Sequence, residues 1–75
     1  MPKLPRISIR EAIRALERLG FELVRQTGSH IVMKKETEEG EIGCVVPLHR
    51  ELKIGTLSGI LKQAQVTPEE FIESL

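Results

Sequence analysis

The two histidines are the residues of this sequence best suited to proton transfer. Imidazole changes its charge near neutral pH, so a positioned histidine can accept and donate a proton during catalysis. His30 directly follows the turn residues Gly28 and Ser29 at the start of an expected strand, and His49 lies in an expected loop after Pro47. A polar hairpin end and a solvated loop are the more common explanations for such histidines. The pattern therefore nominates His30 for chemistry but does not make it catalytic.

Two other kinds of chemistry are not indicated by the sequence. The histidines are far apart in the chain, and the single cysteine, Cys44, sits in an apolar run that predicts a buried strand residue. This spacing does not resemble a set of metal ligands, so we expect no metal and no cofactor. A nucleophile pair made of Ser29 and His30 is also disfavoured, because neighbouring side chains on a strand point to opposite faces.

A row of arginines offers a possible contact with phosphates. Arg10, Arg14 and Arg18 recur every four residues, which places them on one side of a helix. They favour a phosphate track and a solvated face balanced by Glu11 and Glu17 about equally.

Two further positions could attract anions. If Ile31 and Met33 point toward the helices, strand alternation puts Lys34 on the open face of the sheet together with His30. At the start of the second expected helix, free backbone N–H groups lie near Lys53 and Thr56, where an anion can approach.

Capping and apolar spacing define three expected helices. Ser8 and Glu11 form a capping box ahead of a helix over 9–19, which Gly20 ends. Apolar residues at helical spacing predict a second helix over 54–64. A second capping box, with Pro68 at the first helical position, predicts a short C-terminal helix.

Between the first two helices, runs of apolar residues separated by turn residues predict three strands. The strands are expected at 21–26, 30–34 and 41–47, and the connections at 27–29, 35–40 and 48–52. The order is α-β-β-β-α plus a short C-terminal helix. We therefore expect an α+β fold with a three-stranded antiparallel sheet and helices on one face, forming one domain over 1–75.

Composition limits the function classes. The 75 residues suffice for one domain, and no stretch has the character of a signal peptide or a membrane span, which predicts a cytoplasmic protein. Net charge is zero, but residues 1–35 hold eight basic against three acidic side chains and residues 36–75 hold three against eight. This asymmetry suggests one face for a polyanion. Only two aromatic residues are present, which argues against RNA binding by stacked rings.

Several segments together resemble the HicA-like (YcfA-like) toxin family of toxin–antitoxin pairs. The segments are Gly20-Phe21-Glu22-Leu23-Val24-Arg25-Gln26-Thr27-Gly28-Ser29-His30, Val46-Pro47-Leu48-His49, Leu52 to Leu57, Ile60 to Ala64 and the Pro68-Glu69-Glu70-Phe71 ending. The resemblance implies a fold like that of the double-stranded-RNA-binding domain (dsRBD) and a metal-independent endoribonuclease that cuts mRNA. It also implies a HicB-like antitoxin partner that masks the active histidine. Catalytic function carries onto His30, whereas His49 receives no role.

Two rival interpretations remain open at this point. A non-catalytic RNA-binding module would share the fold and the basic residues without needing a histidine, and an interaction domain would serve chiefly to bind the antitoxin. The candidate RNA contacts are Arg10, Arg14, Arg18, Gly28, Ser29, Lys34, Lys53 and Thr56.

Overall fold

The first helix begins where its cap predicts. In the computed structural model, which describes residues 4–48 and 51–75, α1 spans Ile9–Arg18. The backbone N–H of Glu11 donates to Ser8 Oγ at 3.2 Å, and Glu11 Oε1 accepts from the Ser8 backbone at 3.3 Å. The helix ends one residue earlier than expected, with Leu19 as its C-cap. Gly20 then turns the chain with a φ of +100°, a conformation that side chains disfavour.

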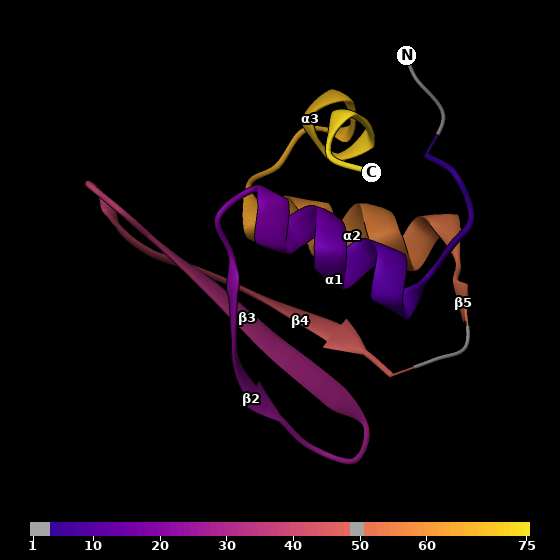
Figure 1. Cartoon of the computed structure of the whole chain (residues 1–75), viewed down its shortest axis with the longest axis horizontal. Coiled ribbons are helices and arrows are strands. Elements are labelled where there is room, and N and C mark those ends of the chain that lie inside the picture. Colours follow the sequence, from indigo (N-terminus) through magenta and orange to yellow (C-terminus); the bar gives the residue numbers. More distant parts are fainter. Residues whose placement is uncertain (1–3, 49–50) are drawn as a thin grey trace.

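Three antiparallel strands follow, and two helices complete the chain. The elements are β2 (Glu22–Gln26), β3 (His30–Thr37), β4 (Gly40–Pro47), α2 (Ile54–Ala64) and α3 (Pro68–Glu73). The sheet order is β2-β3-β4. Figure 1 shows α1 and α2 over one face of this sheet, with α3 on the far side of the two helices. The predicted α+β architecture, consistent with a dsRBD-like arrangement, is thus confirmed.

Strand β3 is longer than the sequence predicts. It pairs with β4 from His30↔Pro47 to Thr37↔Gly40, so the expected connection over 35–40 shrinks to a tight turn. Thr37 Oγ1 donates to the Gly40 carbonyl at 2.7 Å and accepts from the Glu39 backbone at 3.2 Å, which closes this turn. The added residues Lys35, Glu36 and Thr37 are all polar, so the sequence of the extension lacks the alternation of apolar and polar residues that marks a half-buried strand.

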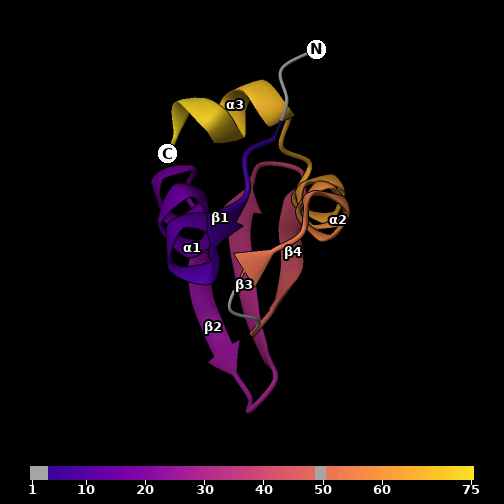
Figure 2. The same cartoon turned by 90° about the vertical axis from the view of Figure 1, so that its right-hand side faces the viewer.

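A second, very short pairing was not predicted. β1 (Ile7–Ser8) pairs antiparallel with β5 (Glu51–Leu52). The prediction of a loop over 48–52 is therefore wrong at its end, because Glu51 and Leu52 belong to a strand. Ile7 and Leu52 are both buried, and together they hold the starts of α1 and α2 near each other, as Figure 2 shows. Two-residue strands have no periodicity that a sequence pattern could detect.

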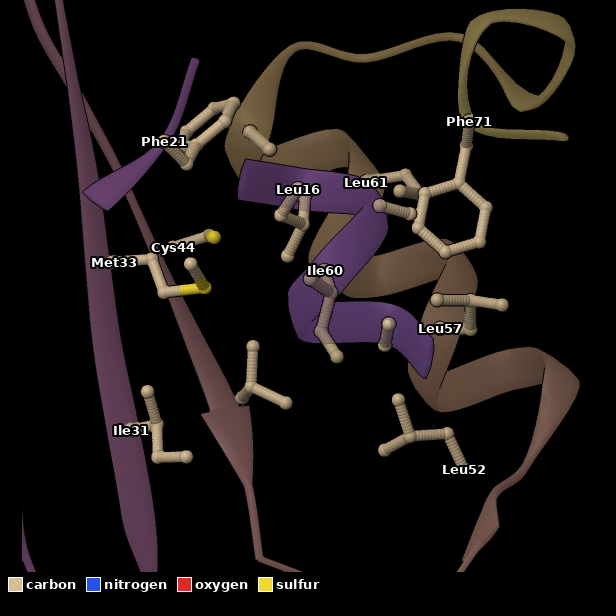
Figure 3. Packing of buried hydrophobic residues seen from close by; sticks show 14 of the residues in the cluster. Leu16, Phe21, Ile31, Met33, Cys44, Leu52, Leu57, Ile60, Leu61 and Phe71 are labelled. Atoms are coloured by element: carbon tan, nitrogen blue, oxygen red, sulfur yellow. The ribbon is translucent and has the colours of Figure 1, made fainter. Parts of the chain in front are cut away.

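The core lies between the sheet and the helices (Figure 3). Its sheet side is formed by Ile31, Met33, Cys44 and Val46, which are all buried. The helix side is formed by buried residues of all three helices, including Leu16, Leu57, Ile60, Leu61 and Phe71. Since residues on β3 alternate, the burial of Ile31 and Met33 directs the intervening side chains away from the helices. Within the described residues, no helix is long and apolar enough to cross a membrane.

Candidate functional site

The β2–β3 turn fixes the backbone on which the nominated histidine stands. Thr27 Oγ1 accepts from the backbone N–H of His30 at 3.0 Å and of Ser29 at 3.3 Å. The Thr27 backbone N–H donates to the His30 carbonyl at 2.8 Å. On the other side of the turn, the Leu48 backbone N–H donates to the Ser29 carbonyl at 2.9 Å. Ser29 and His30 are therefore held at both their N–H and their C=O groups, while a Cβ on Gly28 would meet nothing within 4 Å.

Ser29 contacts the imidazole directly. Its Oγ lies 2.8 Å from His30 Nδ1, which is a hydrogen-bonding distance. The tautomer of the imidazole decides which of the two atoms donates. The expectation that these side chains point to opposite faces is wrong, because Ser29 belongs to the turn and not to the strand. The other ring nitrogen, Nε2, makes no hydrogen bond to residues 4–48 or 51–75. The site thus presents an exposed imidazole with one nitrogen held by Ser29 and one that has no hydrogen-bond partner among the described residues.

The open face of the sheet carries the histidine, as expected from alternation. His30 and Lys34 are exposed, whereas Ile31 and Met33 between them are buried against the helices. No described helix covers this face (Figure 1). No helix of the described part of the chain therefore blocks an extended ligand from His30.

Lys34 occupies an acidic part of the same face. Its Nζ lies 3.1 Å from Glu41 Oε1. The surrounding hollow, about 340 Å³ in volume, is also lined by Glu22 and Glu36, together with Gly20 and Val24. Three carboxylates around one ammonium repel phosphate, so the charge of Lys34 is largely balanced within the protein.

Arg25 is a cation that pattern reasoning missed. The pairing of β2 with β3 shifts register between Leu23 and Arg25, so that Arg25, and not Val24, lies opposite Val32. Residues directly opposite each other in an antiparallel pair share a face. Arg25 therefore lies on the open face with His30. A regular strand would have put it opposite the buried Ile31, and the sequence has no glycine in β2 that would signal the bulge.

The arginine row of α1 lies elsewhere. Arg10, Arg14 and Arg18 are exposed, as expected. However, Arg18 Nη1 donates to the Ser74 carbonyl after α3 at 2.7 Å, and Arg14 and Arg18 line a hollow of about 180 Å³ with Leu75. Arg14 and Arg18 thus face the α3 side of the molecule, and the structure does not bring them together with His30.

The start of α2 is open to solvent. Lys53 is the N-cap residue, its side chain makes no capping hydrogen bond, and Thr56 is half-buried. A Cβ on Gly55 would meet nothing within 4 Å, which leaves the backbone accessible. This end of α2 and the β2–β3 turn both lie toward the right-hand end of Figure 1.

Neither the thiol nor a carboxylate cluster offers another reactive centre among the described residues. Cys44 is buried, and burial raises the pKa of its thiol to about 11, so it stays protonated near neutral pH. No group of three or more histidine, cysteine, aspartate or glutamate side chains is placed to hold a metal ion in the described part of the chain. His49 lies outside the described residues.

The fold and the exposed histidine define a small α+β protein of dsRBD-like arrangement with a hairpin-borne imidazole. Residues 9–66, from the start of α1 to just beyond α2, match the family model described as the HicA toxin of bacterial toxin–antitoxin systems. The chain belongs to this HicA toxin family, and membership implies an antitoxin partner. No curated protein matches the chain at a significant level.

Proposed function

We propose that this chain is an endoribonuclease that cleaves mRNA and that His30 is its general acid or base. Toxins of the HicA family cleave mRNA. The single observation that supports the residue assignment is the exposed imidazole on the uncovered sheet face, held at Nδ1 by Ser29 and without a hydrogen bond from Nε2 to the described residues. A general acid or base must reach the atom whose proton it moves, and an exposed histidine on an uncovered face is suited to this requirement.

The proposed reaction uses a nucleophile that the RNA carries itself. The 2′-oxygen attacks the adjacent phosphorus and loses its proton to a general base, while the bond from phosphorus to the 5′-oxygen breaks. That oxygen then takes up a proton, which leaves a 2′,3′-cyclic phosphate and a 5′-hydroxyl end. Because the 2′-oxygen is already next to the phosphorus, the attack gains from proximity. His30 supplies one of the two proton transfers.

The proposal includes a HicB-like antitoxin that covers the open face around His30, with both proteins in the cytoplasm. Three strands present this face, and no described helix lies over it. A protein seated there would exclude mRNA from the imidazole. Inhibition would then require no change in the toxin's own fold.

Replacing the imidazole tests the proposal directly. We expect His30→Ala to lower the rate of RNA cleavage at least about 100-fold, which is the scale of general acid–base catalysis. His30 is exposed, so circular dichroism and thermal unfolding should match those of the wild type. Cleavage is measured on purified proteins with and without EDTA, and wild-type activity should survive chelation. Cleavage by the variant at the wild-type rate would overturn the assignment, and a wild type that binds RNA without shortening it would favour the non-catalytic module.

A further inference from the structure

We propose that Arg25 binds the RNA phosphate at the His30 site, a role that rests on the proposed function. The bulge in β2 is the first support. Because Leu23 pairs with Met33 and Arg25 pairs with Val32, one residue is extra in β2, and every side chain after it changes face. The bulge thus turns a cation from the helix side of the sheet to the side that carries the imidazole.

The second support is proximity. Val32 lies directly across from Arg25, and His30 lies two residues before Val32 on the same face of β3. The backbone positions of such diagonal neighbours are typically roughly 7–8 Å apart, a distance that a long side chain can span. A phosphate lying over the ladder can therefore contact the guanidinium and the imidazole at once.

The third support is that the charge of Arg25 is unbalanced. Lys34 pairs with Glu41, and Arg18 donates to the Ser74 carbonyl. Arg25 is exposed and makes no ion pair or hydrogen bond to residues 4–48 or 51–75. Of the cations on the open face within residues 4–48 and 51–75, Arg25 is thus the one whose charge remains for a ligand.

Guanidinium chemistry suits the proposed reaction. Its planar fork donates two parallel hydrogen bonds to a phosphate, and its positive charge stabilises the negative charge that grows on the phosphoryl oxygens in the transition state. Arg25 would bind the phosphate, and His30 would move the proton.

A binding experiment tests Arg25 separately from cleavage. The His30→Ala protein and the same protein with Arg25→Ala are titrated with a short fluorescein-labelled single-stranded RNA at several salt concentrations. We expect Arg25→Ala to weaken binding about tenfold. It should also reduce the slope of log K against log salt by about 0.7, the value for one phosphate contact on a single strand. Lys62→Ala is the matched control, because Lys62 is an exposed cation on α2, on the helix side of the sheet, and it should leave the slope unchanged.

Cleavage by proteins that keep His30 completes the test. Arg25→Ala should cleave at least about tenfold more slowly, and Arg25→Lys should recover part of the loss because it restores the charge without the planar fork. An unchanged slope in Arg25→Ala would overturn the role of Arg25, even if His30 proved essential. Conversely, full cleavage by His30→Ala would overturn the proposed function, while the slope would still report whether Arg25 contacts RNA.

Discussion

One hydrogen bond governs the imidazole at the scale of single residues. Ser29 Oγ lies 2.8 Å from His30 Nδ1. If Nδ1 carries the proton, it donates to the hydroxyl, and the lone pair on Nε2 can act as a base. In the imidazolium, Nδ1 still donates, and Nε2 can act as an acid. The hydroxyl can accept in both of these states, so Ser29 can keep the ring in place while Nε2 gains and loses a proton.

Removing this hydroxyl should slow cleavage without preventing RNA from binding. We expect Ser29→Ala to lower kcat about tenfold with little change in KM, because one neutral hydrogen bond is lost and the ring is less well oriented. Ser29→Thr keeps a hydroxyl and should retain more activity than Ser29→Ala. Steady-state cleavage of a labelled RNA measures both constants.

Ser74→Ala is a suitable control, since Ser74 lies after α3 and its Oγ bonds to the Glu70 carbonyl. It should cleave like the wild type. Equal kcat values for Ser29→Ala and Ser74→Ala would contradict an orienting role for the Ser29 hydroxyl.

At the scale of elements, the two hairpins of the sheet are closed by similar turns, in each of which a threonine hydroxyl bonds to the backbone. In the β2–β3 turn, Thr27 Oγ1 bonds to the Ser29 and His30 backbone. In the β3–β4 turn, Thr37 Oγ1 bonds to the Gly40 carbonyl and the Glu39 backbone. Only the first turn carries the histidine. The pair therefore allows the stability of a turn to be separated from its effect on the site.

Replacing each threonine by valine should reveal this difference. Thr27→Val and Thr37→Val each lose the hydroxyl bonds of one turn, so each should destabilise the fold by about 1 kcal/mol. Only Thr27→Val should also reduce cleavage, because the backbone of His30 is then less firmly held. Urea unfolding and RNA cleavage measure the two effects. A loss of cleavage of the same size in Thr37→Val would mean that stability alone explains the result.

The longer elements were predictable because their signals are local. The capping boxes at Ser8 and Thr67 and the apolar spacing of α2 each lie within one segment of sequence, and all appear in the structure. The pairing of Ile7 with Leu52 joins distant segments that are too short for a periodic pattern. The extension of β3 was hidden for a different reason, since its polar residues resemble a loop until β4 pairs with them.

The site was predictable only in part. Alternation placed His30 and Lys34 on one face, which the burial of Ile31 and Met33 confirms. The same rule failed where the strand is irregular, because it separated Ser29 from His30 and would have turned Arg25 toward the helices. A bulge depends on pairing with a neighbouring strand, and no local pattern in this sequence indicates it. The turn boundary before His30 was predicted correctly, but strand alternation does not hold across that boundary.

At the scale of the whole molecule, folding mixes the two charge halves of the sequence. Lys34 belongs to the basic first half, yet it pairs with Glu41 from the acidic second half. The hollow around this pair is lined by Glu22 and Glu36 as well. The open face is therefore acidic around Lys34, although Arg25 and His30 share that face. Net charge along the chain is thus a poor guide to where RNA would lie.

The helix layer also separates the arginine row of α1 from the histidine. Arg14 and Arg18 line a hollow beside Leu75, on the α3 side, whereas His30 lies on the open face of the sheet. A short RNA bound at His30 would not reach both surfaces. We therefore expect the double substitution Arg10→Ala and Arg14→Ala to leave the cleavage rate of a short RNA unchanged, with Arg25→Ala as the comparison that should reduce it.

Longer RNA distinguishes the two interpretations of the arginine row. A long mRNA can pass around the edge of the domain, so a phosphate track on α1 would contribute to its binding, whereas a solvated face would not. Cleavage of a short and a long RNA is compared for the double variant at low and high salt. A loss confined to the long RNA at low salt would assign the row to a phosphate track, and equal rates would leave it as a solvated face. If the double variant cleaved the short RNA as slowly as Arg25→Ala does, this result would contradict the separation of the two surfaces.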